Sequence, residues 1–206
     1  MRCAKRLGLV ALASLLCGCE AHLPARIEVV SVTAFRTDDP GEAMPWYAAR
    51  SDRPAIRLLR VALRADRDLF EYARQHGSTV VSSAYGCDEQ AALGQQVWAP
   101  PYLMVGEHPI DGVSEASKSF TDQAREAPGR FAYAIVLPLG EPPFQAIYDE
   151  TTRKSNVRLP LHDIHGGHSD LCFQIHGGQM WTGWRYTSAT IRVPRAAILL
   201  AIEHST

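Results

Sequence analysis

The sequence lacks any apolar run long enough to cross a membrane as a helix. Such a helix needs about 20 consecutive apolar residues, and the longest apolar stretch, residues 7–17, is shorter. Basic residues are not in excess either, because the 206-residue chain has a formal net charge of -1. These features exclude a polytopic membrane protein and argue against a nucleic-acid partner. With 46% hydrophobic and 21% charged residues, the composition is that of a folded domain.

The sequence also lacks the short motifs of common hydrolases. Gly-x-Ser-x-Gly, Ser-x-x-Lys and His-Glu-x-x-His are all missing. Neighbouring carboxylates occur at residues 38–39 and 149–150, but pairs of this kind usually lie in solvated turns. We therefore predict a protein without catalytic activity and keep an envelope hydrolase as a further alternative.

The first nineteen residues carry the clearest signal. Met1 to Arg6 is a short basic start, and residues 7–17 form an apolar run of eleven residues. This order is typical of a secretory signal peptide. Residues 16–19, Leu-Cys-Gly-Cys, resemble the lipobox of bacterial lipoproteins, with Leu three positions before the final Cys and small residues between.

That resemblance implies cleavage after Gly18, diacylglycerol on the Cys19 sulfur and an acyl chain such as palmitate on the new amino end. Glu20 follows the cysteine, which by the sorting rule of such lipoproteins implies an outer-membrane location facing the periplasm. Residues 1–18 are then a signal peptide, 19–25 a lipidated tether and 26–206 a single β-rich globular domain. The alternative is an ordinary signal peptide cut nearby.

Cysteine usage agrees with an extracytoplasmic location. Once Cys3 and Cys17 are removed and Cys19 carries lipid, Cys87 and Cys172 remain. In an oxidising compartment two such thiols most simply form one disulfide. The alternative, a nucleophilic or metal-binding cysteine, has no Cys-x-x-Cys motif to support it.

Short β-branched and alternating segments separated by Pro and Gly predict an α+β fold that is mainly antiparallel β, with a sandwich-like core and one or two short helices. Strands are expected at 27–35, 58–64, 79–85, 102–105, 131–137, 145–148, 171–176 and 190–193. Gly177-Gly178 suits a tight turn. Pro194, as the first helical residue, is expected to open a C-terminal helix over 195–203.

Residues 50–76 allow two interpretations. Arginines recur every three or four residues and would form a basic stripe on one helix; they are Arg50, Arg53, Arg57, Arg60, Arg64 and Arg67. A strand followed by a helix is favoured, because the segment alternates before Asp66. Asp66 is expected to cap the helix and Gly77 to end it.

Histidines cluster late in the chain, at His162, His165, His168 and His176. The Gly-Gly pair between His165 and His168 could let the two rings converge, with His162 or Asp170 as a third ligand. Imidazole with carboxylate suits zinc or copper. The alternatives are a polar surface loop and a pH-responsive contact.

Trp181, Trp184 and Tyr186 form an aromatic group near the last hairpin. Regular alternation does not place both tryptophans on one face, so at least one is expected to be exposed as an anchor for a partner. Packing inside the core is the alternative.

Together these features predict a lipid-anchored periplasmic protein that binds another protein and has no cofactor. An inhibitor or immunity protein against a toxin fits, as does an accessory subunit of an envelope complex. A metal-binding lipoprotein that uses His162 to His176 is the alternative.

Overall fold

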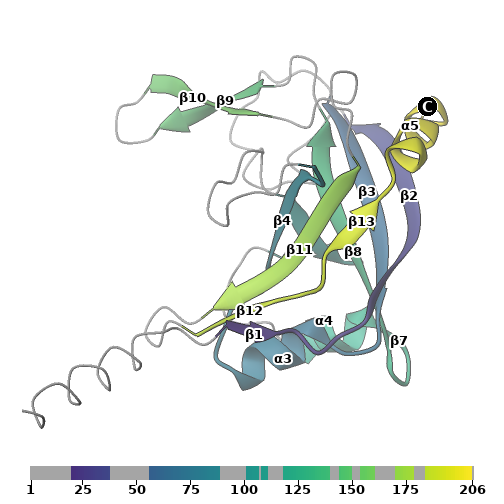
Figure 1. Cartoon of the computed structure of the whole chain (residues 1–206), viewed down its shortest axis with the longest axis vertical. Coiled ribbons are helices and arrows are strands. Elements are labelled where there is room, and N and C mark those ends of the chain that lie inside the picture. Colours follow the sequence, from purple (N-terminus) through teal and green to yellow (C-terminus); the bar gives the residue numbers. More distant parts are fainter. Residues whose placement is uncertain are drawn as a thin grey trace, which may run out of the picture.

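A computed structural model of the chain describes residues 20–37, 56–88, 101–106, 108–110, 118–139, 144–149, 154–160, 170–178 and 184–205. These residues form two larger β-sheets that pack as a sandwich, a separate hairpin and three short helices (Figure 1). Neighbouring strands are mostly antiparallel. The predicted fold class is confirmed.

The first sheet has the strand order β2-β3-β8-β5-β6, and β7 also pairs with β8. Its strands are β2 (Ile27–Thr37), β3 (Ile56–Ala65), β5 (Tyr102–Val105), β6 (His108–Ile110), β7 (Arg125–Ala127) and β8 (Arg130–Leu139). Alternation along β3 buries Leu59, Val61 and Leu63 on one face, as predicted.

The second sheet has the order β1-β12-β11-β13, and β4 pairs with the other edge of β11. Its strands are β1 (Glu20–His22), β4 (Val81–Gly86), β11 (Leu171–Gly178), β12 (Arg185–Thr187) and β13 (Ile191–Val193). β1 runs parallel to β12.

Two predictions about this sheet are wrong. Gly177 and Gly178 do not form a turn; they continue β11 and pair with Tyr186 and Arg185. A Cβ atom on Gly177 would overlap the carbonyl oxygen of Thr79 and the ring of Tyr186, so glycine permits the close approach. Residues 20–22 are not a tether either, because they pair with β12 as a strand. The folded domain therefore includes Glu20.

The core lies between the two sheets and is closed at one end by α3 (Leu69–Gln75). It contains apolar residues of both sheets, including Val61, Leu63, Ile135, Leu137, Phe173, Ile175 and Val193. Phe70 of α3 is 1% exposed and joins the same cluster. Removing this apolar surface from water is the main favourable contribution to folding.

α3 confirms the strand-then-helix interpretation but corrects its cap. Asp68, not Asp66, is the N-cap, because its Oδ1 accepts a hydrogen bond from the amide of Phe70 at 2.9 Å. Asp66 instead accepts from the amide of Arg26 at 2.8 Å. Gly77 follows the helix with φ of 57°, so the prediction of its end is confirmed.

α4 (Lys118–Ala124) and α5 (Arg195–Glu203) complete the described helices. α5 confirms the predicted C-terminal helix. Pro194 was expected to be the first helical residue. It is instead the N-cap of α5, and the helix begins at Arg195. Across the described ranges, no helix is both long and apolar enough to cross a membrane.

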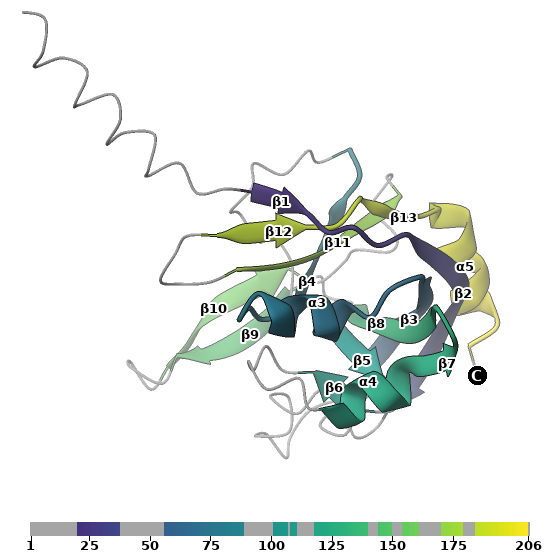
Figure 2. The same cartoon turned by 90° about the horizontal axis from the view of Figure 1, so that it is seen from below.

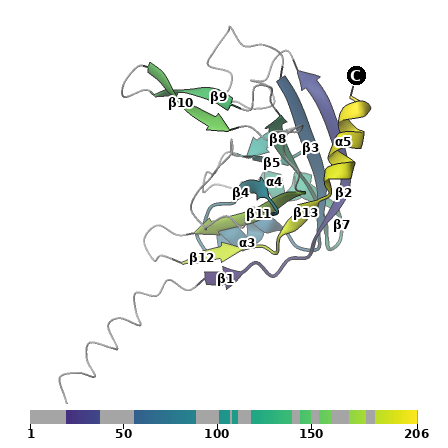
Figure 3. The same ribbon diagram turned by 45° about the horizontal axis from the view of Figure 1, so that its top comes forward.

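The sandwich has two distinct ends (Figures 1 and 2). β1 and α3 lie at one end, which we call the amino end. β2 finishes and β3 begins at the opposite end, which also contains α5; we call it the distal end. The hairpin of β9 (Phe144–Asp149) and β10 (Lys154–Pro160) stands apart from both larger sheets (Figure 3).

Candidate functional site

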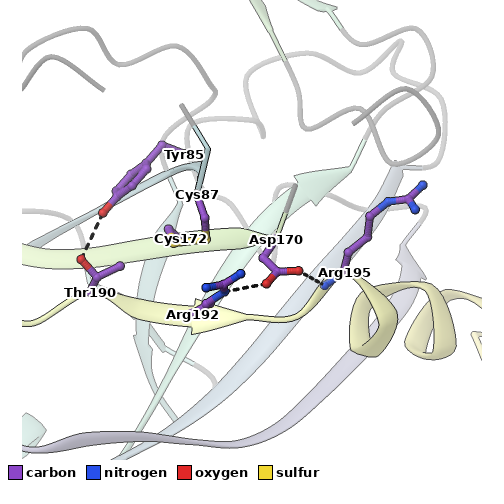
Figure 4. The surroundings of a disulfide bond; sticks show 7 residues. All are labelled: Tyr85, Cys87, Asp170, Cys172, Thr190, Arg192 and Arg195. Carbon is purple, nitrogen blue, oxygen red and sulfur yellow. Dashed lines mark hydrogen bonds and ion pairs between the residues drawn. A yellow bond between two sulfur atoms is a disulfide. The ribbon is translucent and has the colours of Figure 1, made fainter. Parts of the chain in front are cut away.

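Cys87 and Cys172 form a disulfide, with an S–S distance of 2.03 Å and a Cα–Cα distance of 5.1 Å (Figure 4). This confirms the predicted pairing. The bond joins the chain just after β4 to the start of β11, two strands that are also hydrogen-bonded to one another. It therefore fixes the distal end of the second sheet covalently.

One face of the second sheet points away from the core. Ala84, Phe173 and Ile191 are register partners whose side chains are buried against the first sheet. Because side chains alternate along a strand, their neighbours lie on the opposite face. We call this the outer face, and define it by Ser83, Tyr85, Gln174, His176 and Arg192.

Polar contacts hold the distal part of the outer face in place (Figure 4). Asp170 Oδ2 accepts from Arg192 Nε at 2.6 Å, and Asp170 Oδ1 accepts from the Arg195 amide at 2.9 Å. These hydrogen bonds, the Arg195 amide first, lower the pKa of the Asp170 carboxyl below its usual value. The side chain of Arg192 nevertheless remains 67% exposed.

Tyr85 is also positioned on this face. Its hydroxyl lies 3.4 Å from Thr190 Oγ1, and Cys172 is its register partner on β11. Arg192 pairs with Cys172 on the other side of that strand. Cys172 thus lies on β11 between Tyr85 of β4 and Arg192 of β13.

The structure tests only part of the predicted histidine site. His162, His165 and His168 lie outside the described residues. His176 is half-buried on the outer face, and burial lowers the pKa of its imidazole below 6.5. No group of three or more His, Cys, Asp or Glu that could hold a metal occurs within the part of the chain that is described. Zinc or copper binding stays a prediction.

Of the predicted aromatic group, the structure describes Trp184 and Tyr186. Trp181 lies outside the described residues. Tyr186 is 1% exposed and donates from its hydroxyl to the carbonyl of Thr79 at 2.7 Å, so it is a core residue. Its burial does not fit the predicted contact with a partner and agrees with the alternative, packing inside the core. The reason is that β12 turns this side chain toward the sandwich interior.

Trp184 is half-buried beside α3. Its ring stacks on His76, with centroids 4.6 Å apart and planes inclined by 9°, and approaches Tyr72 at 6.3 Å. His76 and Tyr72 were not predicted to belong to this group. Their spacing of four residues, which places both on one helix face, is the signal that could have identified them.

Tyr85, Arg192 and the contacts of Asp170 were likewise not predicted as a site. Alternation indicated that β11 and β13 are strands, but not that Cys172 pairs with both Tyr85 and Arg192. Cys19 and residues 1–18 lie outside the described residues, so the lipobox interpretation continues to depend on the sequence. No family model matches the chain, and neither curated proteins nor solved structures include a match.

Proposed function

We propose that this chain is a lipid-anchored protein of the cell envelope that binds another protein and has no catalytic activity. The observation that carries the proposal is the outer face of the second sheet. There the disulfide and the Asp170–Arg192 contact hold a tyrosine and an exposed arginine on rigid strands.

Two features support the proposed compartment. The Cys87–Cys172 disulfide is a kind of bond that persists in oxidising compartments such as the periplasm. The lipobox-like residues 16–19 favour attachment to a membrane through Cys19. Both support a location on the periplasmic side of a membrane, and Glu20 favours the outer membrane.

The chemistry of the outer face suits a protein partner. Tyrosine and arginine are enriched where proteins contact one another, and they often supply much of the binding energy. Arg192 is held by Asp170 before any partner arrives, so less side-chain entropy is lost on binding. A toxin neutralised at the envelope, or a subunit of an envelope complex, is the class of partner we propose.

Site-specific photo-crosslinking in cells that produce the full-length chain tests this function. A photoreactive phenylalanine analogue at Tyr85 should give a discrete adduct of higher mass, and Arg192→Glu should weaken that adduct at least several-fold. The matched control carries the analogue at Val30, which is 52% exposed on β2 of the other sheet. An absent adduct at Tyr85, or identical adducts from both positions, would contradict the proposal.

A further inference from the structure

The first described residues of the chain, Glu20–His22, pair directly with the second sheet as strand β1. β1 pairs with β12 in the register Glu20 with Arg185, Ala21 with Tyr186 and His22 with Thr187. The backbone amide of Leu23 donates to the carbonyl of Thr187 at 2.9 Å and extends this contact. Glu20 is therefore held at the edge of the second sheet.

Cys19 and Trp184 directly precede the first register pair of these two parallel strands. Consecutive Cα atoms are about 3.8 Å apart and paired strands about 4.8 Å apart. The covalent chain therefore cannot carry Cys19 farther than about 12 Å, Cα to Cα, from Trp184. Acyl chains on Cys19 would enter the bilayer next to this tryptophan.

Trp184 is held in a defined orientation at that position. It stacks on His76, approaches Tyr72, and lies 5.5 Å, centroid to centroid, from the buried ring of Tyr186. Part of the indole packs against the core while the rest is exposed. Arg185, the next residue, is exposed and adds a positive charge at the same edge.

We propose that the surface formed by Trp184, Arg185 and the adjoining end of α3 lies in the headgroup region of the membrane that holds the Cys19 lipid. This inference depends on the lipid anchor included in the proposed function. Tryptophan favours the membrane interface because its ring is apolar and its indole N–H is polar. Arginine near the surface is attracted to anionic phospholipids.

This orientation has a consequence for the proposed binding face. β11 runs from the distal end, where Cys172 lies, toward the amino end, where Gly178 pairs with Arg185. With the amino end on the membrane, the start of β11, where Tyr85 and Arg192 pair with Cys172, lies at the end of the sheet away from the membrane. The domain then has a membrane-contacting end and a partner-binding end.

Fluorine NMR of the purified, lipidated chain in vesicles tests the orientation. The protein is labelled with 5-fluorotryptophan and placed in vesicles of neutral and anionic phospholipid at 7:3, with a small fraction of headgroup nitroxide lipid. The Trp184 signal is assigned with Trp184→Phe. Leu200→Trp provides a matched reporter, because Leu200 is 56% exposed on α5 at the distal end.

We expect the nitroxide lipid to broaden the Trp184 signal at least five-fold more than the signal of the tryptophan introduced at residue 200. Equal broadening of the two signals, or none at Trp184, overturns the inference and favours contact of this edge with a protein partner instead. Mass spectrometry of the same sample separates this failure from failure of the anchor. A chain without acyl groups on Cys19 overturns both the inference and the lipid-anchored part of the proposed function.

Discussion

At the scale of single residues, one buried carboxylate connects α3 to the first sheet. Asp68 is 5% exposed, and its Oδ1 accepts from the Phe70 amide at 2.9 Å and from the Tyr133 hydroxyl at 3.0 Å. The same hydroxyl accepts from the Leu69 amide at 3.1 Å. The sequence pattern predicted Asp66 as the cap, because the Tyr133 hydroxyl that favours Asp68 is 65 residues away and does not show in the local pattern.

Replacing these two aspartates should therefore have unequal effects. Asp68→Ala removes the cap and leaves buried donors without an acceptor, so it should lower the free energy of unfolding by about 2 kcal/mol or more. Asp66→Ala removes an exposed contact and should cost less than about 1 kcal/mol. Urea unfolding of both variants measures the difference. Equal losses would contradict the assignment of Asp68 as the cap.

His176 should make stability depend on pH. Burial lowers the pKa of its imidazole in the folded state, so the unfolded chain takes up this proton first as the pH falls below 6.5. The contribution of neutral His176 to the free energy of unfolding is complete above pH 6.5. It is lost as the pH falls through the pKa of the folded state. Between pH 7.5 and pH 5.0, the melting temperature of the native chain should fall by more than the melting temperature of the His176→Gln variant. Parallel curves would show that His176 is not buried in this way.

At the scale of elements, alternation and turn residues predicted most of the strands but not all of their pairings. The segments that became β2, β3, β8 and β11 show their pattern locally. β3 alternates between buried and partly buried residues, whereas β8 is a continuous apolar run because its residues 133–139 are buried on both faces. Gly177-Gly178 has the local pattern of a turn, and only Thr79 and Tyr186, which are distant in sequence, require glycine inside the strand. Residues 20–22 become a strand for a similar reason, because β12 supplies the edge on which they pair.

The disulfide should contribute strongly to stability because it closes a long loop. Cys87 and Cys172 are 85 residues apart, which corresponds to about 4 kcal/mol of loop entropy in the unfolded chain. The double variant Cys87→Ser/Cys172→Ser should lose about that much free energy of unfolding in urea. Thiol mapping of the native chain should find no free thiol at either position. A loss below about 1 kcal/mol would contradict this account.

α5 provides an internal comparison between buried and exposed apolar residues. Ile198 is 1% exposed, so Ile198→Ala should lower the free energy of unfolding by about 2–4 kcal/mol. Leu200 is 56% exposed on the same helix, and Leu200→Ala should change it by less than about 0.5 kcal/mol. Similar losses in the two variants would mean that α5 does not pack on the sandwich as the structure has it.

At the scale of the whole molecule, the sandwich places the amino end and the distal part of the outer face far apart. The sequence indicated the cysteine pair and the aromatic residues, but it could not show their places on the two ends. Tyr85 and Arg192 are more than a hundred residues apart and meet beside Cys172 only because β4 and β13 pair with opposite edges of β11. Trp184 reaches the amino end through the parallel pairing of β1 and β12.

Attachment to a membrane through Cys19 is our proposal, and intact-mass analysis of the native protein is its decisive test. The protein should be purified from the membranes of cells that produce the full-length chain, with Cys19→Ser as the control. We predict a mature chain that begins at Cys19 and carries diacylglyceryl and acyl groups, and an unprocessed or unlipidated product for Cys19→Ser. A native chain with an unmodified Cys19, or one cut at another residue, would overturn the proposed lipid anchor.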